Sequence, residues 1–228
     1  MVVAGIEVEL VQKDIKNLHL AVYPPHGRVR LAAPVDVNEK TLELYVTSKL
    51  PWIRRQQRKF AKINRESPRQ YLNRESHCFL GKRYLLRVNE VDHPFFQPKV
   101  EFKSKIYIDL YVKVNYSIEQ KADLMKEWYR AELKRILFEL VPKWEKLLGV
   151  KSNLIKVRSM KTKWGSCNTD NKNILFNIEL AKKPIECIEY VVVHELLHLL
   201  ERKHSDLFKA YLDKYVPNWK SIKEILNA

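Results

Sequence analysis

The sequence is poor in cysteine and glycine, and it has no long uninterrupted apolar run. Its 228 residues include five glycines and three cysteines, Cys78, Cys167 and Cys187. Three widely spaced cysteines fit neither a disulfide framework nor a Cys-x-x-Cys zinc ribbon. Charged residues interrupt the apolar runs well before the roughly 18 residues that a membrane span needs. These absences argue against a disulfide-stapled secreted domain and against an integral membrane protein, and we expect a cytoplasmic protein.

What the sequence has in excess is positive charge. The formal net charge is +15 and the isoelectric point is about 9.6. Nine basic residues lie between Lys49 and Arg74, where Glu66 is the only acid. An excess of this size predicts attraction to an anionic partner such as nucleic acid, a nucleotide or an acidic protein.

Many of these basic residues fall on a predicted helix. Over residues 52–65 they recur every three or four positions, along one stripe or beside it. They are Arg54, Arg55, Arg58, Lys59, Lys62 and Arg65. The stripe is either a phosphate-contacting surface for nucleic acid or another polyanion, or a solvated face above Trp52, Ile53 and Phe60.

Residues 1–116 are interpreted as a β-rich subdomain that carries this one basic helix. Alternating or continuous apolar runs predict strands. The strands are expected over residues 6–10, 18–22, 78–86 and 99–114. Gly81 suits a hairpin turn within the third run. The helix is expected over residues 38–63, with an interruption at Pro51.

Residues 117–228 are interpreted as a second domain. Ser117 and Gln120 form a predicted capping box at the start of a long helix that Gly149 ends. A strand, a loop and a second strand are expected next, over residues 154–160, 163–168 and 174–180. Pro184 then begins another helix. The fold class predicted for the chain is α+β, with this last helix packed on a small sheet.

The helix after Pro184 carries the motif His-Glu-x-x-His at His194, Glu195 and His198. Histidines four positions apart project from one face, about 6 Å apart along the helix axis, and can share one zinc ion. Glu195 lies one position round the helix, where it can hold a water at the metal without being a ligand. Chance gives this pattern in fewer than about 1% of chains of this length. The alternative is a buried helix whose histidines only form hydrogen bonds.

A catalytic zinc site needs a third protein ligand, and three residues are candidates. On a continuous helix Glu201 lies about 10.5 Å beyond His194, too far to share one ion. His204 can reach the ion only if the helix ends near residues 201–203 and the chain turns sharply. Glu224 would act as a distant glutamate ligand, and we rank it below His204.

The turn to His204 has no glycine. The metzincin motif has glycine at the position of Glu201, so we expect Arg202 or Lys203 to adopt a left-handed conformation at a cost of about 1 kcal/mol. Ser205 is placed to cap a new helix directly after the turn.

Several blocks of residues around the motif share the pattern of a known family. They are Arg158-x-Met160-x-x-Lys163-Trp164-Gly165-Ser166-Cys167, Asn177-x-x-Leu180, Pro184, Tyr190-Val191-Val192-Val193-His194-Glu195-Leu196-x-His198 and His204-Ser205-x-x-Phe208. Together with Pro51-Trp52-Ile53 and Phe79-Leu80-Gly81-Lys82-Arg83-Tyr84, they resemble the YgjP-like metallopeptidase domain family over nearly the whole chain.

This resemblance implies a zincin-like catalytic domain with zinc as cofactor and Glu195 as catalytic base. It also implies that the zinc ligands are His194, His198 and His204. Family members often have asparagine immediately before the third histidine, where this chain has Lys203.

The segment from Trp164 to Ser166 is a candidate for substrate binding. Gly165 permits close approach of a substrate backbone, and a strand beside the zinc helix could pair with an extended peptide. Structural roles are the alternative, with Trp164 in the core and Cys167 as a small buried apolar residue.

The leading hypothesis for function is a zinc metallopeptidase that uses a zinc-bound water with Glu195 as general base. A peptide or protein is then the substrate, and no membrane is expected as a partner. One alternative is a metal-dependent hydrolase of nucleotides or other phosphoanhydrides, with phosphate charge neutralised by Arg158, Lys161 and Lys163. Another is a nucleic-acid-binding protein that recruits the protease domain through the basic helix.

Overall fold

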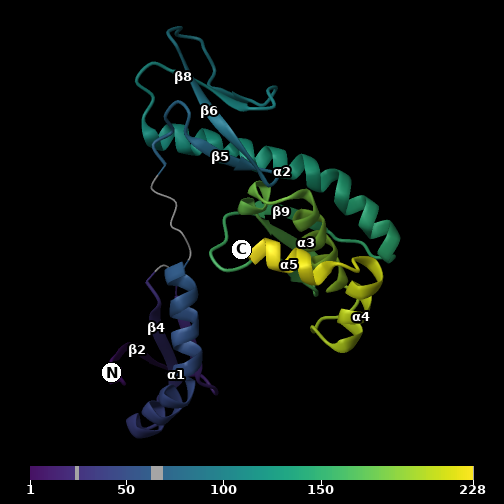
Figure 1. Ribbon diagram of the computed structural model, residues 1–228. Coiled ribbons are helices and arrows are strands. Elements are labelled where there is room, and N and C mark those ends of the chain that lie inside the picture. Colours follow the sequence, from purple (N-terminus) through teal and green to yellow (C-terminus); the bar gives the residue numbers. More distant parts are fainter. Residues whose placement is uncertain (24–25, 63–68, 228) are drawn as a thin grey trace. The chain divides into compact units, whose positions relative to one another are not determined.

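The computed structural model describes three stretches of the chain, residues 1–23, 26–62 and 69–227. Helices and three small sheets make up the described residues (Figure 1), so the predicted α+β class is confirmed. The chain divides into two compact units, Met1–Pro68 and Arg69–Ala228.

The first unit is a four-stranded sheet with one helix packed on it. Its strands follow the order β1-β2-β4-β3, with β2 parallel and β3 antiparallel to β4. The elements are β1 (Val2–Val3), β2 (Ile6–Lys13), β3 (His19–Tyr23), β4 (Arg28–Pro34) and α1 (Glu39–Lys62). Alternate side chains of β4 are buried, at Val29, Leu31 and Ala33, because a strand turns every second residue to the same face. They share a core with Leu42 and Val46 of α1.

The sequence predicted an interruption of helix α1 at Pro51, and this prediction was wrong. It runs from Glu39 to Lys62 with Pro51 inside it. Pro51 is exposed, so water can satisfy the carbonyl that loses its partner when proline replaces an N–H donor. The cost of a proline inside a helix is smaller on a solvent face than in a core.

The second unit begins with a sheet of order β5-β6-β8-β7. The strands are β5 (Ser76–Phe79), β6 (Lys82–Val91), β7 (Lys99–Glu101) and β8 (Tyr107–Lys113). The predicted hairpin turn lies between β5 and β6, where Leu80 and Gly81 have φ of 48° and 76°. Their N–H groups donate to the carbonyls of Ala181 and Lys182 at 2.9 and 3.1 Å. The hairpin tip is thereby tied to the segment just before α3 (Ile185–Leu197), the helix that carries the His-Glu-x-x-His motif.

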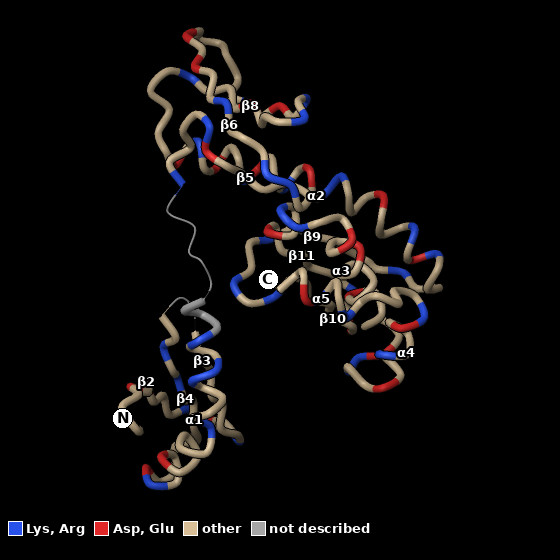
Figure 2. Tube along the Cα trace, in the orientation of Figure 1, with Lys and Arg blue, Asp and Glu red and all other residues tan. Residues whose placement is uncertain are grey.

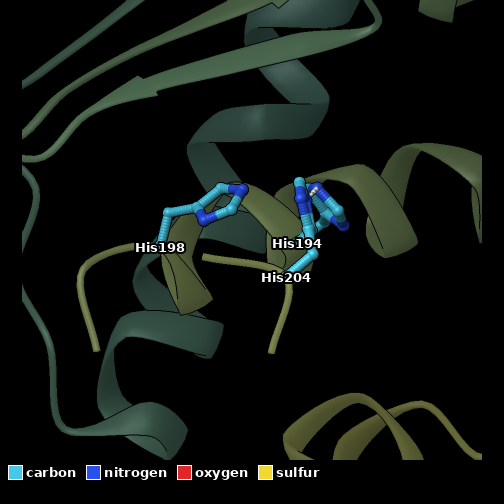
Figure 3. A group of neighbouring side chains, drawn as sticks. All are labelled: His194, His198 and His204. Carbon is cyan, nitrogen blue, oxygen red and sulfur yellow. Dashed lines mark hydrogen bonds between the residues drawn. The ribbon is translucent and has the colours of Figure 1, made fainter. Parts of the chain in front are cut away.

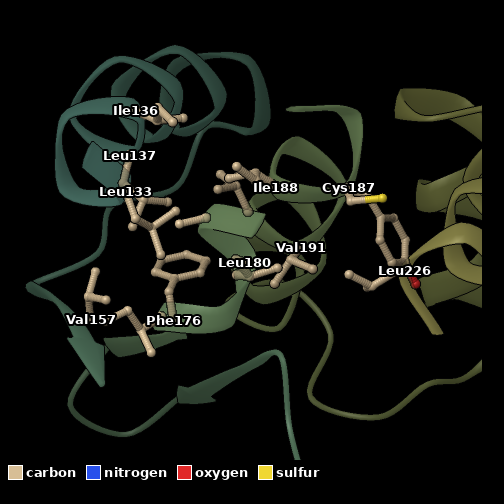
Figure 4. Close-up of a cluster of buried hydrophobic side chains, with 14 of the residues drawn as sticks. Leu133, Ile136, Leu137, Val157, Phe176, Leu180, Cys187, Ile188, Val191 and Leu226 are labelled. Atoms are coloured by element: carbon tan, nitrogen blue, oxygen red, sulfur yellow. The ribbon is translucent and has the colours of Figure 1, made fainter. Parts of the chain in front are cut away.

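Helix α2 (Ile118–Leu148) is the main support of the second unit. The predicted capping box of Ser117 and Gln120 is present, and Gly149 ends the helix with φ of 68°. Figure 4 shows α2 side chains packed against Phe176 and Ile188, which lie on later elements of the chain. No helix within the described residues is both long enough and apolar enough to cross a membrane.

A three-stranded sheet, one 3₁₀ helix and three short α-helices complete the unit. They are β9 (Leu154–Arg158), β10 (Gly165–Asn168), β11 (Asn173–Asn177), the 3₁₀ helix η1 (Ile178–Lys182), α3 (Ile185–Leu197), α4 (Asp206–Tyr215) and α5 (Trp219–Asn227). The sheet order is β10-β11-β9. The loop expected over residues 163–168 is therefore partly a strand, because Gly165 to Asn168 pair antiparallel with β11 although their side chains do not alternate in polarity.

The division into compact units falls at Pro68, and the domain boundary expected near residue 116 stays a prediction. Phe79, Leu86 and Ile108 of the β5–β8 sheet are at most 1% exposed and belong to the same core as Met125 of α2. The sheet buries its apolar face against α2, so it forms part of the second unit.

Glu145 offers a test of how α2 is joined to β9. Its carboxylate accepts bonds from Ser152 N and Oγ at 2.8 and 2.6 Å and from Lys151 Nζ at 2.6 Å. Burial raises the pKa of Glu145, but the bonds from Lys151 and Ser152 outweigh it, so the pKa lies below its usual value. Glu145→Gln should lower the free energy of unfolding at pH 7 by about 1–3 kcal/mol.

A group with a lowered folded-state pKa stabilises the fold above its unfolded pKa of about 4.3 and loses this effect as the pH falls through the folded value. The difference between wild type and Glu145→Gln in urea unfolding should therefore be constant from pH 8 to 6 and shrink below about pH 5. The exposed Glu139→Gln is the matched control and should change stability by less than about 0.5 kcal/mol. A difference that is the same at pH 7 and pH 3 would contradict this role of Glu145.

Candidate metal centre

The His-Glu-x-x-His motif lies at the end of α3, the most apolar helix of the second unit. Val192 and Val193 before the motif, and Leu196 and Leu197 within it, are fully buried. α3 is in contact with α2, η1, β10, α4 and α5, so apolar neighbours cover most of its surface. The two histidines of the motif, Glu195 and Tyr190 are the polar residues of this region that line the cleft described below.

The helix ends one turn earlier than expected. α3 stops at Leu197 and His198 is its C-cap, whereas the sequence placed the end near residues 201–203. The chain then continues in tight turns, with the N–H groups of Leu199 and Leu200 bonded to carbonyls three residues earlier at 3.0 and 2.9 Å. Such turns keep φ negative.

The expected left-handed residue is absent. Neither Arg202 nor Lys203 has a positive φ, so that prediction was wrong. Glu201 takes part in the turn instead, since its carboxylate accepts the Lys203 N–H at 2.9 Å. Its backbone carbonyl lies 3.2 Å from His198 Nδ1. Glu201 thus orients His198 and supports the turn.

The turn brings His204 back to the face of α3 that carries His194 and His198. One ring nitrogen from each of the three histidines lies within 4.8 Å of the others (Figure 3). His204 Nε2 is 3.0 Å from His194 Nε2. The predicted cap supports this position, because Ser205 Oγ accepts the Phe208 N–H at 3.3 Å at the start of α4.

The geometry and protonation of this group fit a metal cation. Burial, together with the charges of the neighbouring histidines, lowers the pKa of His194 to about 3, and burial lowers the pKa of His198. Both rings are then neutral at pH 7, which is the form that binds a metal. The Nε2 atoms of His194 and His204 lie 3.0 Å apart, close enough to share one cation. A tetrahedral zinc ion with bonds of about 2.0–2.1 Å holds its nitrogens about 3.3 Å apart.

Phe208 packs against all three histidines. Its ring centroid lies 5.0 Å from that of His194, 4.8 Å from that of His198 and 4.9 Å from that of His204. The side chain is 1% exposed and lies on α4. One apolar ring therefore contacts all three imidazoles and restricts their orientation.

Glu195 is held against strand β10. It is 5% exposed, and burial raises its pKa to about 7 against the opposing effects of Lys163 and of the Cys167 N–H bonded to the carboxylate. A Cβ added to Gly165 would lie 2.5 Å from Glu195 Oε1. Glycine at residue 165 is therefore required by the glutamate itself, a role that the sequence alone did not suggest.

A cleft of about 700 Å³ opens over the histidines and Glu195. The three predicted substrate-binding residues, Trp164, Gly165 and Ser166, all line it. Lys163 lines the same cleft, whereas Arg158 does not. Glu224, the other candidate ligand, is exposed on α5 and lies outside the histidine group.

Comparison with known proteins gives the family. Residues 16–228 match the profile of the YgjP-like metallopeptidase domain. The chain belongs to the YgjP-like metallopeptidase family. No curated protein matches it.

Two solved structures also match part of this chain. They are the metallopeptidase zymogens of abylysin from Pyrococcus abyssi and of jannalysin from Methanocaldococcus jannaschii, each 23% identical to this chain. The first match covers 39% of this chain and 87% of abylysin with a TM-score of 0.35. The second covers 40% of this chain and 90% of jannalysin with a TM-score of 0.34.

In this YgjP-like chain, the site also uses residues that sequence reasoning did not select. Tyr190 lies one turn before His194, and their ring centroids are 5.8 Å apart. Lys223 and Asn227 of α5 line the cleft, and Asn227 Oδ1 accepts a bond from Trp164 Nε1 at 3.3 Å. The position of Tyr190, four residues before His194, could have placed it at the site from the sequence alone. No local pattern indicates that α5 returns to the cleft.

The basic helix α1 belongs to the first unit. Arg54, Arg55 and Arg58 are exposed, and Figure 2 shows basic positions in the second half of α1. The side chains of Lys59 and Lys62 and the whole of Arg65 lie outside the described residues. Binding of nucleic acid or another polyanion by this helix stays a prediction.

Metal analysis of purified protein tests the third ligand. We expect close to one zinc per chain in the wild type and a loss of affinity of more than about 100-fold in His204→Ala, because a direct ligand matters at least as much as a residue that only orients one. Glu224→Ala is the matched control and should retain zinc. Full zinc content in His204→Ala, with loss in Glu224→Ala, would move the third ligand to α5.

Proposed function

We propose that this chain is a zinc-dependent peptidase whose ion is held by His194, His198 and His204. The observation that carries the proposal is the convergence of three imidazole nitrogens within 4.8 Å, beside the buried carboxylate of Glu195. Membership of a metallopeptidase family supports the same reading. Three histidines leave one position of a tetrahedral ion open, as a catalytic site requires.

Within this site Glu195 is the proposed general base. Zinc, when bound, lowers the pKa of a water toward about 7 and polarises a carbonyl group. The Glu195 carboxylate accepts a proton from the attacking water and then donates it to the leaving amine. The Cys167 N–H, bonded to the same carboxylate, keeps it pointed into the cleft.

Strand β10 is the proposed docking edge for a peptide. It pairs with β11 on one side only, and it lines the cleft beside α3. An extended peptide can add to such an edge through main-chain hydrogen bonds. Trp164 and Ser166 then flank the bound chain, in the substrate-binding role predicted for them.

The phosphoanhydride alternative has less support. Of the three cations it invokes, only Lys163 lines the cleft; Arg158 faces a separate hollow, and Lys161 lines neither. Enzymes of phosphoryl transfer usually hold Mg²⁺ through carboxylates, whereas the group here consists of three histidines. We therefore favour peptide over nucleotide as substrate.

Glu195→Gln tests the assignment of the base. The variant should keep its zinc, because the side chain is not a ligand, and its turnover of casein should fall by about 10²- to 10⁴-fold. Glu224→Gln, an exposed change on α5, is the matched control and should leave turnover unaltered. Wild-type rates in Glu195→Gln would overturn the role of this residue.

The same protein should be offered a panel of nucleotides with phosphate release monitored. Release that depends on Glu195, in a protein inactive on casein and peptides, would replace the peptidase proposal by the phosphoanhydride alternative.

Gly165→Ala tests the contact between β10 and Glu195. The added Cβ would meet Oε1 at 2.5 Å, so Glu195 must move, and we expect a loss of turnover of at least about tenfold with zinc retained. The same substitution in the Glu195→Gln background should cost much less, because the displaced base is already disabled. Equal losses in both backgrounds would show that Gly165 acts on the substrate instead.

A further inference from the structure

Helix α1 of the first unit carries arginines that have no partner within the described part of the chain. Arg54, Arg55 and Arg58 are exposed, and none of them forms an ion pair or a side-chain hydrogen bond with another described residue. Arg28 of the same unit, by contrast, lies 3.7 Å from the Glu9 carboxylate. The positive charge in the second half of α1 is therefore available to an external partner.

These three arginines point away from the sheet on which α1 packs. Ile53 is fully buried, and the Gln57 side chain donates to the Gly27 carbonyl at 3.0 Å, so this side of the helix faces the sheet. The arginines lie about 100° to 200° round the helix from Ile53 and within about 6 Å of one another along its axis. They form one compact positive surface on the outer side of α1.

The acidic residues of α1 lie at the other end of the helix. Glu39 and Glu43 are in its first two turns, about 16 Å or more along the axis from Arg54. Figure 2 shows the basic positions gathered in the second half of α1. Because charges are screened over about 8 Å at physiological ionic strength, these acids do not neutralise the arginines.

Trp52 adds an exposed aromatic surface beside the arginines. Its side chain is 36% exposed, whereas the neighbouring Ile53 is fully buried. The indole has no ring contact with another described residue. Trp52 lies three residues before Arg55, so the two side chains are neighbours on the helix surface. An exposed indole offers a flat surface on which a nucleic-acid base can stack.

We propose that Arg54, Arg55 and Arg58, with Trp52 at their edge, form a surface (the arginine face) that binds the phosphate backbone of nucleic acid. A guanidinium group matches phosphate because it offers two parallel N–H donors to two oxygens. Contacts to phosphate carry no sequence information, so binding is independent of base sequence. This function goes beyond the peptidase and does not depend on the metal centre.

An anionic membrane is another partner that such a charge could attract, but the rest of α1 does not suit it. A helix that lies in a membrane surface buries an apolar face in the lipid. The apolar side of α1, with Leu42 and Val46, is already packed in the core of the unit. Leu44 is the one exposed aliphatic residue among the described side chains of α1, about 15 Å along the axis from Arg54. A partner that requires charge rather than apolar area fits the arginine face better.

The test measures binding of the full chain to a labelled DNA duplex and a labelled RNA duplex by fluorescence anisotropy, over a series of salt concentrations. For phosphate contacts the logarithm of affinity falls linearly with the logarithm of salt concentration, with a slope of about −0.9 per contact. The variant with Arg54→Gln, Arg55→Gln and Arg58→Gln should have a slope shallower by about three and bind at least about tenfold more weakly at low salt.

Two matched variants separate this face from net charge and from folding. Lys126→Gln, Lys134→Gln and Lys146→Gln, three exposed lysines of α2, make the same change in net charge and should alter the slope by less than about one. Lysine in place of all three arginines keeps the charge and should keep most of the slope. Glutamine forms helix almost as well as arginine, so α1 should persist. If the triple variant does not fold, each single variant should lower the slope by about one.

The outcomes decide between the partners. Binding of either duplex that the triple glutamine variant weakens, with a scrambled sequence bound equally well, would support the arginine face. An unchanged slope in that variant, or an equal loss in the α2 variant, would overturn it. Binding to vesicles of anionic lipid without binding to either duplex would overturn it in favour of a membrane. Glu195→Gln should bind the duplexes like the wild type, so failure of the peptidase proposal would leave this inference standing.

Discussion

The contact between the Glu195 carboxylate and strand β10 is the constraint on which the site depends. A carboxylate that is 5% exposed on an apolar helix is costly unless it is hydrogen-bonded, and the Cys167 N–H supplies that bond. The bond requires β10 to lie directly against α3, and the space for this exists only because residue 165 is glycine. The position of Glu195 thus fixes the strand that forms one wall of the cleft, which is also the proposed docking edge for a peptide.

The return of the chain to His204 follows a different route from the one that glycine provides. A left-handed residue would have reversed the chain in one step. Here the last turn of α3 tightens, and Glu201 supplies two acceptors, its carbonyl to His198 Nδ1 and its carboxylate to the Lys203 N–H. The residue in the place of the metzincin glycine therefore stabilises the turn through its side chain and also sets the orientation of a proposed ligand.

Features that depend on nearby residues could be predicted from the sequence, and those that depend on distant residues could not. The histidine spacing and the cap at Ser205 are local, and the structure has them as expected. Strand β10 was expected to be a loop because polar and apolar side chains do not alternate along it. One of its residues is a glycine, and a Cβ at this position would collide with Glu195. The packing of the β5–β8 sheet and α2 into one core could not be predicted, because a change from strands to helix does not reveal that both share a core.

A metal ion at this centre would join the end of α3 to the segment that leads into α4. α3 is fixed in the core, where Leu196 and Leu197 are fully buried. His204 is exposed and is followed by the cap of α4, and its ring is held by Phe208 and by His194. In a zinc finger the metal supplies the folding energy because there is little core without it. Here the core is complete without the ion, so the binding energy acts on the segment between α3 and α4, and the same ion that would serve catalysis would also fix the third histidine in place.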